Sequence, residues 1–336
     1  MGKEITVTNK HMANLNTTYA GLKLRNPFII SSSGLTSSLE RIRKLDSLGA
    51  GAIVLKSLFE EQILHEAGTM AESSDYPEAM DYLNRYTREN SVAEYLNLIR
   101  DSKKAVQIPV IASINCVSSG EWVDFARRIE EAGADALELN VFFLPVDKNK
   151  AGSEYEKIYF ELLEKLKGSL GIPLIIKLGS NFTNPTNIVN QLYFRKADAV
   201  VLFNRFYSPD IYLDEMSMGS SDVFSSPSDI RTTLRWIGII SSIIPEIDLA
   251  ASTGVHSGEG AVKMILAGAT AVQLCSVLYK NGLEFLSDII DKLESWMLNN
   301  DYKSLEEFRG KMNYSNFENP QVYERAQFMR YFSNLH

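Results

Sequence analysis

The chain has 336 residues, of which 45% are hydrophobic and 23% charged, and these are ordinary proportions for a soluble globular protein. Its formal charge of -8 argues against nucleic acid or an anionic membrane as a partner, because both require a basic surface. Two cysteines exclude a disulfide framework and a cysteine-based zinc site, and we expect no metal. No apolar stretch reaches the ~20 residues of a membrane span, and the polar N-terminus lacks a signal core, so we expect a cytoplasmic protein.

The first predicted element is a hairpin over Thr17–Asn26, with a turn at Gly21-Leu22 between short alternating segments. We expect it to close the floor of the fold. Residues 1–14, before it, are a native extension or an expression remnant and are excluded from the predicted fold.

Eight short apolar runs rich in β-branched residues follow, and each is succeeded by a segment with helical periodicity. The runs are Pro27–Ser33, Gly51–Ser57, Pro109–Asn115, Ala136–Val141, Pro173–Leu178, Ala199–Asn204, Asp248–Thr253 and Ala271–Ser276. They are mostly apolar rather than alternating, which is typical of parallel strands covered on both faces.

The intervening segments are amphipathic. In Glu121–Ala132, for example, Trp122, Phe125, Ala126 and Ile129 fall on one helical stripe. Eight strand and helix repeats without a polar linker predict an α/β fold, a single-domain (β/α)8 TIM barrel over residues 15–312. The alternative is a doubly wound open sheet, but the Gly-rich first turn typical of that fold is absent.

Three βα loops are longer than a barrel requires, and loops on this face usually build the site. They are Phe59–Tyr95, Phe142–Glu156 and Arg205–Ser228. From Asp301 onward the chain is charged and aromatic, and we expect a helix packed back on the barrel, with residues 313–336 as a C-terminal extension.

Polar residues close five of the predicted strands, where an apolar strand has no local reason to carry them. They are Lys56, Asn115, Asn140, Lys177 and Asn204. A lysine at the end of an apolar strand is costly unless its ammonium reaches a partner. Each residue alone could be a snorkelling lysine or a capping asparagine, but five equivalent positions predict one site at the barrel mouth.

The last two strands end in small residues that suit a phosphate. Thr253-Gly254 follows one strand, and Cys275-Ser276 ends the other and begins a short helix. Barrels often bind phosphate here, through backbone N–H groups and a helix N-terminus.

Several motifs in order along residues 15–312 resemble the class 1 dihydroorotate dehydrogenases. They are Asn26-Pro27-Phe28 through Ser33-Gly34, Leu55-Lys56-Ser57, Glu138-Leu139-Asn140, Ile176-Lys177-Leu178, Thr253-Gly254-Val255 and Tyr302-x-Ser304-Leu-Glu-Glu-Phe308. The bacterial subgroup of dihydroorotate dehydrogenase-like proteins is more similar, since it shares Ser57-Leu-Phe-Glu-Glu-Gln62, Leu139-Asn-Val-Phe-Phe-Leu-Pro145 and Val201-Leu-Phe-Asn-Arg-Phe-Tyr207.

The resemblance implies FMN across the barrel mouth, a small-molecule substrate, a role in pyrimidine biosynthesis and a homodimer. Lys177 would lie near the N1/C2 end of the flavin, where negative charge collects on reduction. Lys56, Lys177, Asn140 and Asn204 would be the catalytic residues. The cofactor would contact Ser32, Ser33, Gly34, Lys56, Ser57, Asn115, Asn140 and Lys177, with its phosphate on Thr253, Gly254, Cys275 and Ser276.

The chain departs from the family at the substrate. The family carries a cysteine base after the fourth strand, where this chain has Phe143, followed by Pro145 in place of an asparagine. Phenylalanine cannot accept a proton. Candidate replacement bases in the mouth loops are His65, Asp75, Tyr76, Asp147, Tyr207 and His256. Asn140, Asn204 and Arg205 are the candidate substrate residues, and Arg205 would bind a carboxylate or form a loop salt bridge.

These observations predict an FMN-dependent oxidoreductase acting on a CH–CH group, whose true substrate differs from dihydroorotate. One alternative is a non-flavin barrel lyase or isomerase with Lys177 or Lys56 as a Schiff-base nucleophile. Another is an FMN-binding protein without turnover.

Overall fold

Eight parallel strands form a closed barrel in the computed structural model, which describes residues 13–59, 77–115 and 122–325. Neighbouring strands pair in chain order, and β13 pairs with β3 to close the ring. The strands are β3 (Phe28–Ile30), β4 (Ala52–Val54), β6 (Val110–Asn115), β7 (Ala136–Asn140), β8 (Leu174–Leu178), β9 (Ala199–Leu202), β12 (Asp248–Ala251) and β13 (Ala271–Leu274). Each lies within one of the predicted apolar runs, so the predicted strand order is confirmed.

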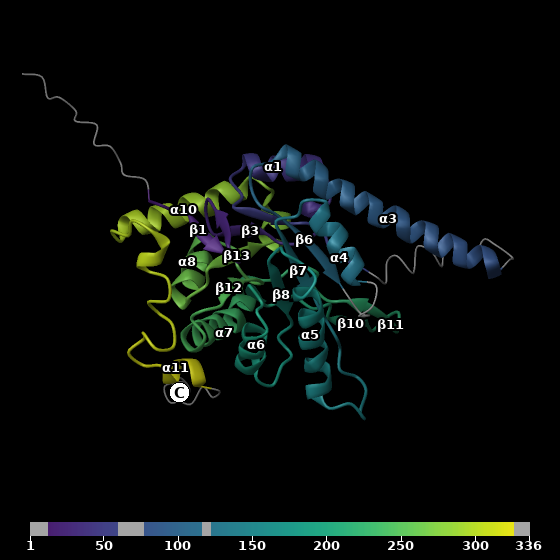
Figure 1. The fold of residues 1–336 in the computed structure, drawn as a ribbon. Coiled ribbons are helices and arrows are strands. Elements are labelled where there is room, and N and C mark those ends of the chain that lie inside the picture. Colours follow the sequence, from purple (N-terminus) through teal and green to yellow (C-terminus); the bar gives the residue numbers. More distant parts are fainter. Residues whose placement is uncertain (1–12, 60–76, 116–121, 326–336) are drawn as a thin grey trace, which may run out of the picture.

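Helices surround the strands (Figure 1). They are α1 (Leu39–Ser47), α3 (Pro77–Ala105), α4 (Trp122–Glu131), α5 (Gly152–Lys167), α6 (Pro185–Phe194), α7 (Ile230–Ile243), α8 (Gly258–Ala267), the short α9 (Ser276–Asn281) and α10 (Phe285–Asn299). The (β/α)8 barrel is therefore confirmed. A two-residue strand, β5 (Leu58–Phe59), extends the pairing along β6.

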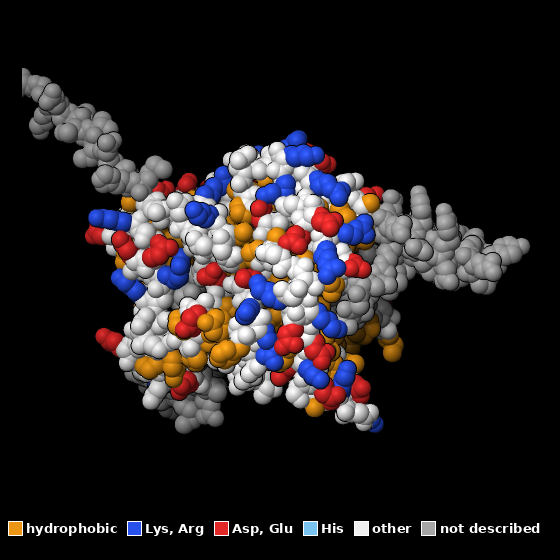
Figure 2. All heavy atoms as spheres, in the orientation of Figure 1, with side chains coloured by type: hydrophobic (Ala, Val, Ile, Leu, Met, Phe, Trp, Pro, Cys, Tyr) orange, Lys and Arg blue, Asp and Glu red, His pale blue; other side chains and the backbone are white. Residues whose placement is uncertain are grey.

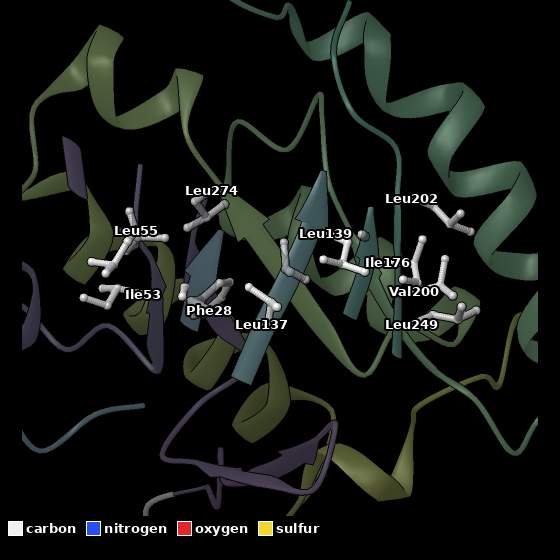
Figure 3. Packing of buried hydrophobic residues seen from close by; sticks show 14 of the residues in the cluster. Phe28, Ile53, Leu55, Leu137, Leu139, Ile176, Val200, Leu202, Leu249 and Leu274 are labelled. Atoms are coloured by element: carbon white, nitrogen blue, oxygen red, sulfur yellow. The ribbon is translucent and has the colours of Figure 1, made fainter. Parts of the chain in front are cut away.

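Alternate residues of the strands belong to two separate cores. Residues such as Leu137, Leu139 and Ile176 face the helices and pack in the outer core (Figure 3). Residues such as Ala136 and Ile175 face the barrel interior and form a smaller apolar layer there. This period of two is the ordinary alternation of a β-strand.

A hairpin of β1 (Thr17–Tyr19) and β2 (Leu22–Leu24) packs Tyr19, Ala20 and Leu24 into the interior core. Its turn residues are Ala20 and Gly21, with φ of 50° and 76°, and not the predicted pair Gly21-Leu22. A two-residue turn with positive φ at both positions matches the twist of the flanking strands, and this places the glycine second.

Three stretches predicted as loops contain regular structure. Within Phe59–Tyr95 the helix α3 begins at Pro77, and within Phe142–Glu156 the helix α5 begins at Gly152. Within Arg205–Ser228 the strands β10 (Pro209–Tyr212) and β11 (Ser217–Ser220) form an antiparallel hairpin. The loop prediction is wrong over these residues, because helical hydrogen bonds begin at the end of the first two stretches and a strand pair forms within the third.

From Asp301 to residue 325, where a helix was predicted, the chain consists of turns and single-turn helices rather than one continuous helix. These are η3 (Leu305–Glu307) and α11 (Gln321–Glu324). Gly310, with φ of 72°, and Pro320 interrupt a helical path. The backbone N–H groups of Gly310 and Met312 donate to the carbonyl oxygens of Ile265 and Leu266 on α8.

Figure 2 shows Lys and Arg side chains interspersed with Asp and Glu over one face of the molecule. Among the described helices, none combines the length and apolar character needed to cross a membrane. Over the same residues there is no group of three or more His, Cys, Asp or Glu side chains that could hold a metal ion.

Candidate functional site

A cavity of about 540 Å³ opens at the carboxyl ends of the barrel strands. Ten residues predicted from the sequence line it: Ser32, Ser33, Lys177, Asn204, Arg205, Tyr207, Thr253, Gly254, Cys275 and Ser276. The remaining walls come largely from residues 206–208 and 220–225, at the two ends of the β10–β11 hairpin. The last two barrel strands, β12 and β13, therefore border the same cavity as Lys177 of β8.

Lys177 lies at the floor of this cavity and is 4% exposed. Its ammonium donates to Ser31 Oγ and to Gln273 Oε1, both at 2.9 Å. The carboxylate oxygen Oε1 of Glu138 lies 3.6 Å from Lys177 Nζ. The costly strand-end lysine thus has three polar neighbours from β7, β13 and the end of β3.

A chain of serine hydroxyls lies beside this group. Ser32 Oγ is 2.9 Å from Ser57 Oγ, which is 2.7 Å from the buried Ser113 Oγ. Tyr95 OH donates to the Ser113 carbonyl oxygen and accepts from its N–H. Burial has the largest effect on the pKa of Tyr95 and raises it, so the Tyr95 hydroxyl keeps its proton at neutral pH. These groups can donate and accept hydrogen bonds, but none is a strong base.

The turn after β12 has an unusual backbone. Thr253 has φ of 75°, a conformation that β-branched residues rarely adopt, and its Oγ1 donates to the Phe203 carbonyl oxygen at 3.0 Å. Gly254 follows with φ of 84°, and a Cβ there would lie 2.1 Å from the backbone nitrogen of Ile230, at the start of α7. This turn is therefore pressed against the N-terminus of a 14-residue helix.

Cys275 and Ser276 border the same turn. The Ser276 hydroxyl accepts from the Ser225 N–H at 3.0 Å. Burial raises the pKa of the Cys275 thiol, while Ser33 and Lys177 act in the opposite direction. A thiol with a raised pKa stays protonated and is a poor nucleophile.

Arg205 lines the cavity, but its guanidinium is engaged within the loop. It pairs with Asp229 at 3.0 Å and also donates to the Asp222 and Val223 carbonyl oxygens. Of the two roles open for Arg205, the structure contains the loop salt bridge.

His256 contacts the loop that covers the cavity. Its Nε2 lies 2.9 Å from the Oγ of the buried Ser225, whose carbonyl oxygen accepts from Lys280 Nζ. Burial and the neighbouring Lys280 lower the pKa of His256.

Five predicted cofactor residues do not line this cavity among the described residues: Gly34, Lys56, Ser57, Asn115 and Asn140. Lys56 is exposed. Asn140 is connected to the cavity through Asn204, whose Nδ2 donates to Asn140 Oδ1 at 2.9 Å. A Cβ at Gly34 would lie 2.7 Å from the Tyr279 hydroxyl, so this backbone packs against a cavity wall instead.

The segment after β7 is aromatic at the position where the resemblance implies a catalytic base. Phe142 packs against Phe206 in a tilted arrangement with ring centroids 4.2 Å apart, and Phe206 lines the cavity. Of the candidate bases, Asp147 and Tyr207 are exposed, and Tyr207 OH donates to the Gly219 carbonyl oxygen. His65, Asp75 and Tyr76 lie outside the described residues.

Sequence reasoning missed three members of the polar group: Ser31, Glu138 and Gln273. The alternation of side chains along a strand could have identified them, because residues two apart point to the same face. Each of the three lies two residues from a predicted site residue or from a residue of the interior apolar layer. Glu138 precedes Asn140 by two, Gln273 precedes Cys275 by two, and Ser31 follows the interior residue Ile29 by two.

Comparison with known proteins gives one family. A family model described as dihydroorotate dehydrogenase matches residues 14–297. The catalytic subunit of dihydroorotate dehydrogenase B (NAD(+)) from Thermoplasma volcanium is 27% identical over 89% of this chain and 98% of its own length. Dihydroorotate dehydrogenase A (fumarate) from Lactococcus lactis subsp. cremoris is 25% identical over 89% of this chain and 99% of its own length. The NAD-dependent dihydropyrimidine dehydrogenase subunit PreA from Escherichia coli (strain K12) is 23% identical over 89% of this chain and 77% of its own length.

Proposed function

The chain belongs to the dihydroorotate dehydrogenase family of oxidoreductases, and from this premise we propose that it uses FMN to oxidise or reduce a small, dihydroorotate-like cyclic amide or carbonyl compound. One observation carries the proposal. A single cavity brings the buried ammonium of Lys177 together with the turn at Thr253-Gly254 and with Ser276.

The described residues fit FMN by chemistry and by size. A cavity of about 540 Å³ is within the ~300–1,000 Å³ typical of cofactor and ligand pockets. Gly254, whose side-chain-free face packs against the start of α7, lines the cavity together with Ser276, and small residues at this position of a barrel suit a phosphate. When bound, FMN would supply the hydride-transferring centre, which no side chain can supply.

The chain's own residues would hold and polarise the reactants. Lys177 presents a fixed positive charge at the cavity floor, and a fixed charge needs no reorganisation as electrons move. The Asn204 amide, held by Asn140, can orient a polar ring substituent through its free carbonyl oxygen. The aromatic rings of Phe206 and Tyr279 line the cavity and exclude water from part of it.

We propose that dihydroorotate itself is a poor substrate. Its oxidation requires removal of a proton next to the carbon that gives up hydride, and Phe143 supplies no base. A compound whose proton leaves more readily, or a carbonyl compound that is reduced, fits this cavity better. The electron partner is a small molecule or another protein.

The test begins with purification, where we expect a yellow protein that releases FMN on denaturation. Anaerobic mixing with dihydroorotate, dihydropyrimidines and related compounds then follows flavin bleaching. A colourless protein that fails to take up FMN at micromolar concentration contradicts the proposal. Bleaching by a cyclic amide other than dihydroorotate supports it.

The two alternatives are distinguished by the same experiment. A Schiff-base lyase needs a neutral lysine, whereas Lys177 is hydrogen-bonded to two acceptors and faces a carboxylate, an arrangement that suits an ammonium. Trapping with borohydride and a carbonyl substrate would support the lyase. An FMN protein that no compound bleaches would support a binding role without turnover.

The proposal includes a homodimer. The exposed side chains of the β10–β11 hairpin support it, since Ile211, Leu213 and Met216 are 61%, 83% and 91% exposed. Apolar side chains gathered on one exposed element usually mark an interaction surface. Light scattering should give twice the mass of 37.7 kDa, and Leu213→Asp should reduce it to the monomer.

A further inference from the structure

Lys177 is paired with a carboxylate on the side away from the cavity. Only 6% of the Lys177 side chain and 1% of the Glu138 side chain are exposed, and Nζ lies 3.6 Å from Glu138 Oε1. Both charges are almost completely buried, so each depends largely on its polar neighbours.

Gln273 connects the two charges without neutralising either. Its Oε1 accepts from Lys177 Nζ and from Ser31 Oγ, and its Nε2 donates to Glu138 Oε2 at 2.6 Å. Because the amide has one acceptor end and one donor end, this arrangement fits only one orientation of the side chain. The ammonium is held toward Ser31 and the cavity, within ion-pair distance of Glu138 but without a hydrogen bond to it.

Glu138 is incompletely compensated. Among the described residues its Oε1 accepts no hydrogen bond, although Glu138 is completely buried. A buried carboxylate with one free oxygen keeps more of its negative charge unscreened than a fully hydrogen-bonded one. That charge opposes the positive charge that Lys177 presents at the cavity floor.

We infer that Glu138 and Gln273 are positioning residues that set how much positive charge Lys177 presents to a bound flavin, and so set its reduction potential. This inference rests on the proposed function. Glu138 lowers the potential, because a fixed negative charge disfavours the charge gained on reduction. Gln273 raises the potential, because its hydrogen bond to Lys177 Nζ holds the ammonium toward the cavity and keeps it from a hydrogen bond with the Glu138 carboxylate.

Two single variants separate this inference from a purely structural role. Glu138→Gln keeps the shape and removes the charge, and we expect the flavin potential to rise. Gln273→Met removes no charge but lets Lys177 move toward Glu138, and we expect the potential to fall, as in Lys177→Met. A tenfold change in the equilibrium between oxidised and reduced flavin corresponds to about 30 mV for a two-electron couple. We expect each shift to be of about this size.

Asp135→Asn is the matched control. Asp135 directly precedes β7, the strand that carries Glu138, and pairs with Lys103 at 2.6 Å at the opposite end of the barrel. This variant also removes one negative charge from an ion pair, but from a partly exposed pair far from the cavity, and we expect a much smaller shift. The potentials are measured against a reference dye in titrations, alongside the dissociation constant for FMN. An unchanged potential in Glu138→Gln and Gln273→Met, with FMN still bound, overturns the inference.

A double variant covers the case in which a single variant does not fold. Glu138→Gln with Lys177→Met removes both charges, a replacement that buried ion pairs often tolerate. Its potential should lie below that of the wild type, because the ammonium that Glu138 acts through is gone, and an equal potential overturns the inference.

If the wild-type protein binds no FMN, the proposed function fails, and the geometry is tested without flavin. Urea unfolding of the wild type, Glu138→Gln, Lys177→Met and the double variant then gives the coupling between Glu138 and Lys177. A favourable coupling supports the pairing on which the inference depends, and additive effects overturn it.

Discussion

The ring of Tyr159 lies edge-on to Phe143, with centroids 6.0 Å apart, and its hydroxyl donates to the Val141 carbonyl oxygen at 3.1 Å. Tyr159 also packs against Phe182. Phe143 is thus part of a packed aromatic group on the segment where the family carries its base. Burial raises the pKa of Tyr159, so this neighbour does not act as a base at neutral pH.

Dihydroorotate turnover should therefore be very slow, and Phe143→Cys should increase it. A positioned base typically contributes ~10²–10⁴-fold to the rate of proton removal. The thiol would restore only part of this factor, because Pro145 still stands in place of an asparagine. We expect a gain of about tenfold in the rate of flavin bleaching by dihydroorotate, measured anaerobically. Phe143→Ala is the control, since it opens the same space without a thiol. Rapid turnover by the unmodified protein would show that another mouth residue is the base.

The backbone strain at Thr253 predicts an unusual order of stabilities. Thr253→Ala and Thr253→Gly both remove the hydrogen bond to the Phe203 carbonyl oxygen, but only glycine relieves the positive φ. The left-handed conformation costs about 1–2 kcal/mol for residues with a Cβ. We expect the glycine variant to be more stable than the alanine variant by about 1 kcal/mol in urea unfolding. The reverse order would contradict a strained turn.

Gly254 and Gly21 form a matched pair. Both have positive φ, at 84° and 76°, but a Cβ at Gly254 would meet the Ile230 backbone at 2.1 Å, and at Gly21 it would meet nothing within 4 Å. Gly21→Ala should cost about 1–2 kcal/mol through strain alone. Gly254→Ala should cost more and should also weaken FMN binding, because the turn must move away from α7. Equal unfolding free energies for the two variants would argue against the close approach.

His256 should make stability depend on pH in a known direction. Its pKa is lowered in the folded protein, so folding favours the neutral imidazole. This contribution is present above the unfolded value of 6.5 and is lost as the pH falls through the lowered pKa. Free energies of unfolding between about pH 5 and 8 should fall less steeply toward acid in His256→Gln than in the wild type. Because the other histidines are common to both proteins, the difference curve isolates His256, and parallel curves would contradict this assignment.

The order of the barrel could be read from the sequence because each strand lies within a mostly apolar run, and five of these runs carry a lysine or asparagine near their end. The runs are longer than the strands, as in Gly51–Ser57 against β4, since the last residues of a run already leave the sheet. The helix over Pro77–Ala105 was also accessible in principle. It contains no glycine, and its single proline is at the first position, where helices accept one.

The site was predictable only in part, for a geometric reason. Lys177 and Thr253 end strands and are visible locally. The partners of Lys177 come from β7, β13 and the segment after β3, which are brought together only when β13 pairs with β3. No local pattern reports that closure. The occupation of Arg205 by Asp229 is likewise set by the path of the hairpin loop.

The closed floor of the barrel has a consequence for solvent and salt. Beneath the polar group lies an apolar interior layer that includes Ile29, Ile111 and Ile175, and below it the β1–β2 hairpin carries Tyr19 and Leu24. Mobile ions cannot enter from that side, and a medium of low dielectric constant screens poorly, so the potential of Lys177 and Glu138 spreads mainly toward the wet mouth. Added salt therefore reaches only the outer part of this potential. It weakens the attraction of a distant charged substrate while leaving the interaction at the cavity floor almost unchanged.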